Sequence, residues 1–227
     1  LTTVQDAGRV GYAAQGYRSC GAADGYAYRL GNVLVGNDPG AAVLECTLRG
    51  AALRFETDTV FALTGAESPA VLDSTPVPYY APLLAKAGSV LQMGAAKTGL
   101  RSYLAVGGGI ATPPVLGSRA TDVKCGIGGL EGRKLTAGDT LPIDSCDTAA
   151  LWQAITAKRL DRPLRDKAVC GGLHPMRVQG TQMLPLLRAV PGPQDAAFTV
   201  QGRQDFIHGI YTPVSYTHLR AHETRSN

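Results

Sequence analysis

Residues 42–63 read AVLECTLRGAALRFETDTVFAL, and this stretch decides the fold class. Within it, residues 44–48 and 53–56 alternate between apolar and polar side chains, while residues 60–63 are continuously apolar. Alternation with a period of two is typical of half-buried β-strands, and a short apolar run is typical of a fully buried strand. The stretch therefore predicts three strands and no helix.

Further short strands are expected outward from this stretch. Residues 71–77 predict a hairpin that turns at Asp73 and Ser74, and residues 89–93 and 102–106 predict single strands. Residues 136–141 predict a turn and a closing strand. Short strands separated by turn residues every ~8–12 positions are typical of an all-β barrel or sandwich, so the chain is expected to be mainly β.

Helices are expected at three places. Asp24 is a good N-cap for a helix that ends at Gly36, and residues 148–160 and 198–210 are also helix-like. A strand is expected over residues 188–195. Four segments follow: a first β-barrel lobe over 1–147, a helix-like insert and linker over 148–184, the start of an incomplete second lobe over 185–213, and a non-native, adapter-like tail over 214–227.

Composition narrows the class of protein. The 227 residues are 44% hydrophobic and 18% charged, with a net charge of +4, which fits a globular protein without a nucleic-acid-binding footprint. No apolar run is long enough to span a membrane. The five cysteines are odd in number and widely spaced, so reduced thiols in a cytoplasmic protein are expected, and no metal site is predicted.

The N-terminal segment is rich in glycine and in polar side chains that suit a binding loop. Gln5, Asp6, Arg9 and Asp24 offer an amide, two carboxylates and a guanidinium. Carboxylates can act as general bases, and arginine binds anions through paired N–H donors. The alternative is structural: aspartates in such loops also cap turns and helices. Both interpretations stay open at this level.

A second candidate is Arg119, which follows a glycine-rich segment. Its guanidinium is expected either to bind a carboxylate or phosphate or to pair with Asp122 or Asp139. Residues 94–99 lack the glycine spacing of a phosphate-binding loop and predict a tight turn with an exposed Lys97. The glycines at 107–109 are expected to let the backbone pass close to another segment or a ligand.

Seven short motifs occur in order along the chain and together resemble one family. They are Thr-x-Gln-Asp-x-Gly-Arg-x-Gly at 3–11, Gly-Ala-x-Asp at 21–24, Asn-x-Leu-Val-Gly-Asn at 32–37, Leu-Thr-Gly-Ala at 63–66, Tyr-Leu-Ala-Val-x-Gly-Gly at 103–109, Leu-Gly-Ser-Arg-Ala-Thr at 116–121 and Val-Pro-Gly-Pro-Gln at 190–194. The chain resembles the biotin-dependent carboxyltransferase (allophanate hydrolase subunit 2) family, and within it the C subunits of bacterial ATP-dependent 5-oxoprolinases. The resemblance runs from about residue 2 to residue 213.

The resemblance implies a cyclophilin-like β-barrel in two lobes, of which the second is incomplete here. It implies hydrolysis of 5-oxo-L-proline to L-glutamate through a phosphorylated lactam, with ATP and its magnesium ion as cofactor. The partners would be two other 5-oxoprolinase subunits, namely a related B subunit and one of a different fold. Asp6 and Asp24 are then the candidate catalytic carboxylates, and Gln5, Arg9 and Arg119 the candidate ligands of substrate or phosphate.

Two other functions are consistent with the same family. One is carboxyl transfer from biotin to urea or a similar amide; the chain has no Ala-Met-Lys-Met biotinylation motif, so the biotin would be carried by another chain. The other is a non-catalytic regulator that binds a kinase-inhibitor partner.

Overall fold

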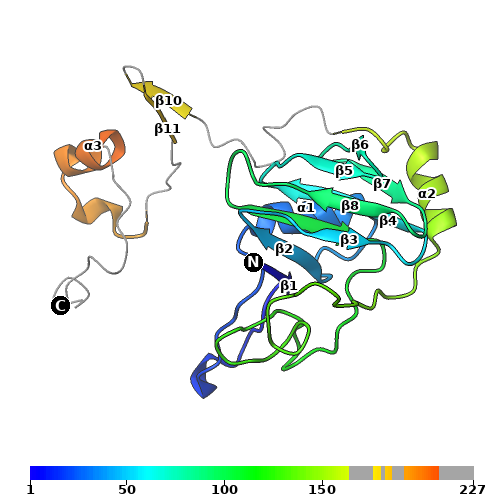
Figure 1. Cartoon of the computed structure of the whole chain (residues 1–227). Coiled ribbons are helices and arrows are strands. Elements are labelled where there is room, and N and C mark those ends of the chain that lie inside the picture. The colour runs from blue at the N-terminus through cyan, green and yellow to red at the C-terminus, as the bar shows by residue number, and fades with distance from the viewer. Residues whose placement is uncertain (164–175, 180–181, 186–191, 210–227) are drawn as a thin grey trace. The chain divides into compact units, whose positions relative to one another are not determined.

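The alternating stretch forms strands in the computed structural model, which describes residues 1–163, 176–179, 182–185 and 192–209. Five strands form one antiparallel sheet, and Figure 1 shows most of them with α1 and α2 beside them. In spatial order they are β1 (Thr2–Gln5), β2 (Val43–Thr47), β9 (Arg101–Val106), β4 (Thr59–Gly65) and β7 (Pro82–Ala85). Glu45 of β2 lies opposite Tyr103 of β9.

A second antiparallel sheet packs against the first. Its strands are β3 (Ala52–Arg54), β8 (Val90–Met93), β5 (Ala70–Leu72) and β6 (Thr75–Pro76), in that spatial order. The predicted hairpin is β5–β6, with residues 73 and 74 at its turn. The mainly β prediction is confirmed, although the ladders of the described residues do not join into one closed barrel.

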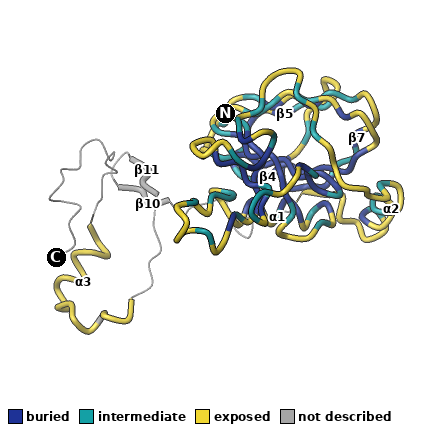
Figure 2. The backbone as a smooth tube through the Cα atoms, turned by 90° about the horizontal axis from the view of Figure 1, so that it is seen from below, coloured by how far each residue is buried: buried dark blue, intermediate teal, exposed yellow. Residues whose placement is uncertain are grey.

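Two apolar clusters cover the two faces of the five-stranded sheet. One includes Phe61, Leu63 and Leu104 together with Leu91 of the second sheet, so it lies between the sheets. The other, on the opposite face, includes Val60 and residues of α1 (Gly25–Leu34) and α2 (Thr148–Ala157). With apolar neighbours on both faces, each central strand is buried except for one terminal residue, and the dark-blue backbone of β4 in Figure 2 shows this.

The helices begin and end where capping chemistry predicts. The Asp24 carboxylate accepts hydrogen bonds from the backbone N–H groups of Tyr26 and Ala27, and α1 stops before Gly36. Asp147 caps α2 in the same way by accepting from the Ala150 N–H. Both predicted helices of this part of the chain are therefore confirmed, with α2 three residues shorter than expected.

Three sequence-based expectations differ from the structure. β1 and β7 were not predicted, and the closing strand expected over 136–141 is wrong. There the Asp139 carboxylate accepts hydrogen bonds from the Thr136 N–H and from the Arg133 guanidinium, which produces a turn. Glu45, which the alternation assigns to an exposed face, is buried.

The glycines at 107–109 approach another part of the same chain. Gly108 has a φ of +88°, and a Cβ placed on it would lie 2.3 Å from the Asp144 carbonyl oxygen. A side chain is therefore excluded there, and the prediction of a close backbone approach is confirmed for a segment of this chain.

The chain divides into two compact units, residues 1–176 and 177–227. The first holds both sheets, α1, α2 and the short 3₁₀ helix Ala13–Gln15. Strands β10 (Met176–Gln179) and β11 (Gln182–Pro185) pair with each other and lie at the end of the predicted linker.

The described part of the second unit also contains the 3₁₀ helix Asp195–Ala197 and α3 (Val200–His208). The helix predicted over 198–210 is thus confirmed as α3. Most of the predicted strand at 188–195 and the whole predicted tail at 214–227 lie outside the described residues.

Candidate functional site

The N-terminal strand and the segment at 112–122 lie against each other and form the candidate site. The Thr121 N–H and side-chain hydroxyl both donate to the Val4 carbonyl oxygen, at 3.0 and 2.9 Å. The Gln5 side-chain amide donates to the Thr121 carbonyl oxygen at 3.3 Å and to the Thr3 hydroxyl at 3.1 Å. Two of the seven sequence motifs, at 3–11 and 116–121, are therefore in direct contact.

Asp6 fixes the turn that carries Arg119. One carboxylate oxygen accepts hydrogen bonds from the Gly8 N–H at 2.8 Å and from the Ser118 hydroxyl at 2.7 Å. The other accepts the Arg119 backbone N–H at 2.5 Å. Asp6 is buried, and both its oxygens bind groups of the protein, so the structure assigns it a positioning role in the described state.

Arg9 is buried and is hydrogen-bonded to the same segment. Its guanidinium donates from Nε to the Val115 carbonyl oxygen at 3.1 Å and from Nη2 to the Ala120 carbonyl oxygen at 3.0 Å. Only 2% of the residue is exposed, and its Nη1 has no hydrogen-bond partner among the described residues. The guanidinium thus holds two main-chain carbonyls and offers little surface to a ligand.

Glycines let a third segment close over Arg9. A Cβ on Gly128 would lie 2.1 Å from the Ala120 carbonyl oxygen and 2.9 Å from Arg9 Nη2. Gly128 also has a φ of +72°, which side chains other than glycine rarely adopt. The glycine cluster in this part of the sequence therefore serves the close packing around Arg9.

Arg119 is the predicted site residue with the most accessible cationic group. Its Nε donates to the Thr112 carbonyl oxygen at 2.7 Å, and its Nη2 lies 3.9 Å from a carboxylate oxygen of Asp144. The side chain is 35% exposed. The alternative pairing with Asp122 or Asp139 is wrong, because Asp122 pairs with Arg18 and Asp139 pairs with Arg133. Arg119 is oriented by a main-chain carbonyl and keeps N–H groups for a further partner.

Asp24 lies at the start of α1, two residues after Ala22, which contacts Asp6. The Ala22 N–H donates to the Asp6 carbonyl oxygen at 3.0 Å. Asp24 is exposed, and a single oxygen, Oδ1, accepts both capping hydrogen bonds. Its second oxygen accepts no hydrogen bond from the described residues, so Asp24 can cap the helix and still present an oxygen to solvent.

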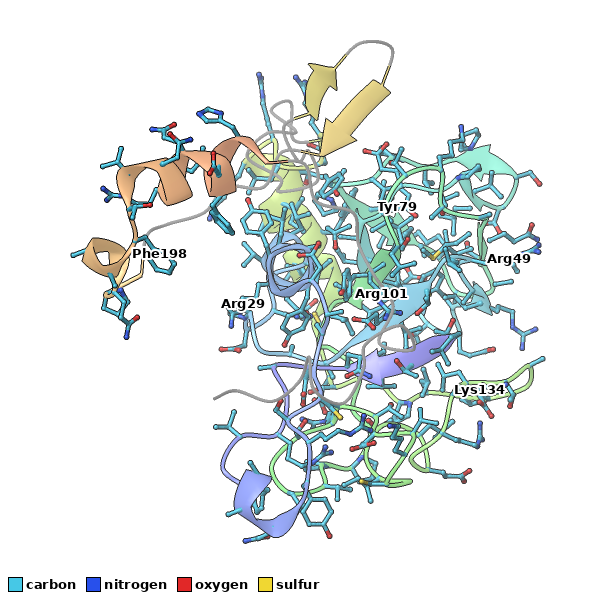
Figure 3. The ribbon with its side chains drawn as sticks, turned by 90° about the vertical axis from the view of Figure 1, so that its left-hand side faces the viewer. Arg29, Arg49, Tyr79, Arg101, Lys134 and Phe198 are labelled. Atoms are coloured by element: carbon cyan, nitrogen blue, oxygen red, sulfur yellow. The ribbon has the colours of Figure 1, made fainter. Side chains whose placement is uncertain are left out.

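A buried polar network beside α1 was missed from the sequence. One Glu45 carboxylate oxygen accepts the Ala23 N–H and the Tyr103 hydroxyl, both at 2.8 Å, and the Tyr103 oxygen accepts the Asp24 N–H at 2.7 Å. Arg101, labelled in Figure 3, lies with its Nε 3.7 Å from the other Glu45 oxygen. Burial, with the neighbouring Glu45 charge, raises the pKa of the Tyr103 hydroxyl, so it stays neutral and joins Glu45 to the start of α1.

A second missed pair is Arg18 and Asp122. The Arg18 guanidinium is hydrogen-bonded to one oxygen of the buried Asp122 carboxylate, which also accepts the Lys124 and Cys125 N–H groups at 3.0 and 3.1 Å. Burial alone would raise the pKa of Asp122, but the hydrogen bonds from Arg18 and the Cys125 N–H outweigh it and hold that pKa well below its usual range. No sequence motif signals this pair, because its members lie 104 positions apart.

A cavity of about 650 Å³ lies apart from the predicted site residues. It is lined by residues from 52–59 and 136–143 together with Leu44, Leu104 and Val106. In the described part of the chain, no group of three or more histidine, cysteine, aspartate or glutamate residues could hold a metal ion. The arrangement can bind an anion at Arg119 and can present one carboxylate oxygen at Asp24.

The family described as carboxyltransferase domain, subdomain A and B, matches residues 15–220. This chain belongs to the carboxyltransferase domain family. The resemblance seen in the sequence motifs is confirmed, and the family match includes the segment at 116–121 that contacts Asp6 and Arg9.

Curated relatives of this carboxyltransferase-domain chain fall into two groups. It is 49% identical to the 5-oxoprolinase C subunit of Escherichia coli over 164 residues, which cover 70% of this chain and 53% of that protein. It is 41% identical to urea amidolyase of Saccharomyces cerevisiae over 145 residues, which cover 63% of this chain and 8% of that protein. The chain spans about half the length of the 5-oxoprolinase relatives that it matches.

Solved structures support the same assignment. The Kluyveromyces lactis urea amidolyase matches with a TM-score of 0.63 and 38% identity, over 65% of this chain and 9% of that one. TTHA0988 matches with a TM-score of 0.60 and 30% identity, over 86% of this chain and 64% of that one.

Among the described residues, none of the helices has the length and apolar character that a membrane span requires.

Proposed function

We propose that this chain acts as the C subunit of an ATP-dependent 5-oxoprolinase, which opens the lactam of 5-oxo-L-proline to give L-glutamate. The supporting observation is the 49% identity to the C subunit of the Escherichia coli 5-oxoprolinase, against 41% to the yeast urea amidolyase. The active enzyme would include two further chains, a related B subunit and one of a different fold, and it would work in the cytoplasm.

Within this proposal, the exposed N–H groups of Arg119 bind the carboxylate of 5-oxoproline or a phosphate group. Arginine suits either anion because its planar guanidinium offers paired donors. Asp6 positions Arg119 through the backbone N–H, and Arg9 supports the same segment through two carbonyls. Gln5 contributes from the adjoining strand by holding the Thr121 carbonyl.

Asp24 is the better placed of the two candidate catalytic carboxylates. Its exposed second oxygen is able to accept a proton from water that attacks the lactam carbon, whereas both Asp6 oxygens already accept hydrogen bonds. We therefore propose Asp24 as the general base and Asp6 as a positioning residue.

The described residues contain no group of three or more histidine, cysteine, aspartate or glutamate residues that could hold a metal ion, and residues 94–99 do not open a helix as a phosphate-binding loop does. We therefore assign no step on this chain to ATP and propose that other parts of the assembled enzyme bind the nucleotide.

A reconstitution with the B subunit and the subunit of different fold tests the proposal. The chain, ATP and 5-oxoproline are added together, and released glutamate is measured. We expect glutamate only when all subunits are present, and at least a tenfold lower rate with Arg119→Ala, since the loss of a charge-assisted hydrogen bond of about 1.5–3 kcal/mol has that effect. Arg54→Ala, which removes an exposed arginine on β3, is the matched control. Subunits that assemble without releasing glutamate would contradict the proposal.

A second candidate function is carboxyl transfer to urea or a similar amide. The likeness to the Kluyveromyces lactis urea amidolyase favours it. Carbon dioxide incorporation that depends on a biotinylated partner chain and on urea, without 5-oxoproline turnover, would select this function over the first.

A further inference from the structure

Side chains of the five-stranded sheet bind the backbone that leads into α1. The Ala23 N–H donates to a carboxylate oxygen of Glu45 on β2 at 2.8 Å, and the Asp24 N–H donates to the hydroxyl oxygen of Tyr103 on β9 at 2.7 Å. The Tyr103 hydroxyl also donates to the same Glu45 oxygen at 2.8 Å, so the two side chains form one connected network. Two successive residues of the chain are therefore fixed by two neighbouring strands of the sheet.

The Asp24 carboxylate is held from the helix side as well. Its Oδ1 accepts the N–H groups of Tyr26 and Ala27 at 3.1 and 3.0 Å. The first turn of α1 is in turn bound to β4, because the Thr64 hydroxyl donates to the Ala27 carbonyl oxygen at 2.8 Å. Oδ2 is the carboxylate oxygen of Asp24 that remains open to another partner. Its position depends on how the sheet holds the start of the helix.

Burial makes this network a poor source of stability. Tyr103 is 0% exposed and Glu45 is 7% exposed. The Arg101 Nε lies 3.7 Å from the second Glu45 oxygen, which is longer than a direct hydrogen bond. A buried carboxylate loses its hydration, and apolar side chains of similar volume often stabilise a core equally well. Stability alone therefore does not explain the network, whereas the fixed place of Asp24 does.

We propose that Glu45 and Tyr103 are positioning residues that hold the Asp24 carboxylate in the geometry that its role as a base requires. This inference rests on the proposed function, in which Asp24 is the general base. Glu45 and Tyr103 are buried, so they act through Asp24 and do not touch the substrate. A base works only within hydrogen-bond reach of the proton that it accepts, so a small displacement of Asp24 should lower kcat and leave KM nearly unchanged.

A cycle of variants in the assembled enzyme tests the proposal through the kcat and KM of glutamate release. Tyr103→Phe removes the hydroxyl and keeps the ring, and we expect kcat to fall roughly tenfold with KM within about twofold. In the Asp24→Asn chain, the same change should lower kcat by less than about twofold, because no carboxylate is left to position. A merely structural role would lower kcat by the same factor in both chains.

Tyr79→Phe is the matched control. Tyr79 is also buried, and its hydroxyl is hydrogen-bonded to the Ser68 hydroxyl at 2.8 Å. Tyr79, labelled in Figure 3, belongs to the cluster between the sheets, whereas Tyr103 belongs to the cluster that includes residues of α1. Both changes should lower the Tm by a similar amount, but Tyr79→Phe should leave kcat unchanged. An equal fall in kcat from both changes would contradict the proposal.

Two changes at Glu45 test whether hydrogen bonds carry the effect. Glu45→Gln keeps an oxygen that can accept from both the Ala23 N–H and the Tyr103 hydroxyl, so its kcat should stay within about threefold of the unaltered chain. Glu45→Ala removes that acceptor and should lower kcat as much as Tyr103→Phe does. Equal losses from Glu45→Gln and Glu45→Ala would contradict positioning through these hydrogen bonds.

The outcomes separate this inference from the proposed function. An unaltered assembly that releases no glutamate would refute the proposed function and the inference with it. Glutamate release with equal losses of kcat from Tyr103→Phe in the unaltered and Asp24→Asn chains would refute the inference alone. If Tyr103→Phe fails to fold by circular dichroism, amide hydrogen exchange of the unaltered chain decides. The Asp24 amide should then exchange slowly, and exchange as fast as in an exposed loop would overturn the proposal.

Discussion

Arg9 and Arg119 are both arginines in glycine-rich motifs and look alike in the sequence. The structure gives them different environments. Arg9 is buried on the carbonyls of Val115 and Ala120, whereas Arg119 keeps a third of its side chain exposed. Sequence reasoning could identify both as anion-binding residue types. It could not separate them, because the partners of Arg9 lie more than 100 positions away and contribute main-chain atoms, which leave no mark in the sequence.

Replacement of each arginine by alanine should separate stability from binding. Arg9→Ala removes two charge-assisted hydrogen bonds and leaves two carbonyls without their donor, so we expect a loss of about 3 kcal/mol in the free energy of unfolding. Arg119→Ala should cost less than about 1 kcal/mol because the side chain is partly exposed. Urea unfolding followed by circular dichroism measures both, and equal losses would contradict this division.

The Arg18–Asp122 pair predicts how stability depends on acid. The pKa of Asp122 is lower in the folded protein than in the unfolded chain, so its contribution is complete above the unfolded value near 4 and is lost as the pH falls below it. Unfolding midpoints between pH 7 and pH 2 should therefore fall less steeply for Asp122→Asn than for the unaltered chain. Glu56→Gln, at an exposed surface pair, is the control and should keep the original slope.

At the level of elements, most of the first sheet follows from periodicity and the rest does not. β2, β4 and β9 of this sheet, and β8 of the second sheet, form where apolar spacing indicates them. β1 was missed because its four residues, Thr-Thr-Val-Gln, carry a single apolar side chain and precede a glycine-rich loop. It becomes a strand through pairing with β2, which is a tertiary effect that a local pattern does not record.

Asp24 allows a test that separates helix capping from catalysis. Asp24→Ala should destabilise the protein by about 1 kcal/mol because two N–H groups of α1 lose their acceptor. Asp24→Asn should retain the stability, since asparagine caps helices equally well, but should lower glutamate release if the carboxylate is the base. Full activity of Asp24→Asn would leave Asp24 with the capping role alone.

At the scale of the whole molecule, the first unit contains the core that the composition requires. Both apolar clusters are formed by residues before position 156, including α2, which packs on the five-stranded sheet. The sequence predicted α2 as part of an insert because its helical spacing is clear, while its packing partner is not visible in the sequence. The candidate site also lies entirely within this unit.

Residues 1–163 should therefore fold without the remainder of the chain. We expect this fragment to unfold in one cooperative transition, with a Tm within about 3 °C of the main transition of the 227-residue chain. Differential scanning calorimetry compares the two. A fragment that shows no transition, or one that needs residues 177–227 in trans, would contradict the division into units.

The position of β1 also has a consequence for synthesis on the ribosome. Its first hydrogen bonds go to β2, but its other side is bonded by the Thr121 N–H at Val4 and by the Leu135 N–H at Thr2. At 5–20 residues per second, the chain is translated for roughly 6–26 s before those donors exist. The first of the described strands to be translated is thus among the last to be enclosed. Until then, the edge of β1 that faces away from β2 has unpaired backbone N–H and C=O groups. Nascent chains would pair with one another along this edge, and a chaperone would protect it most.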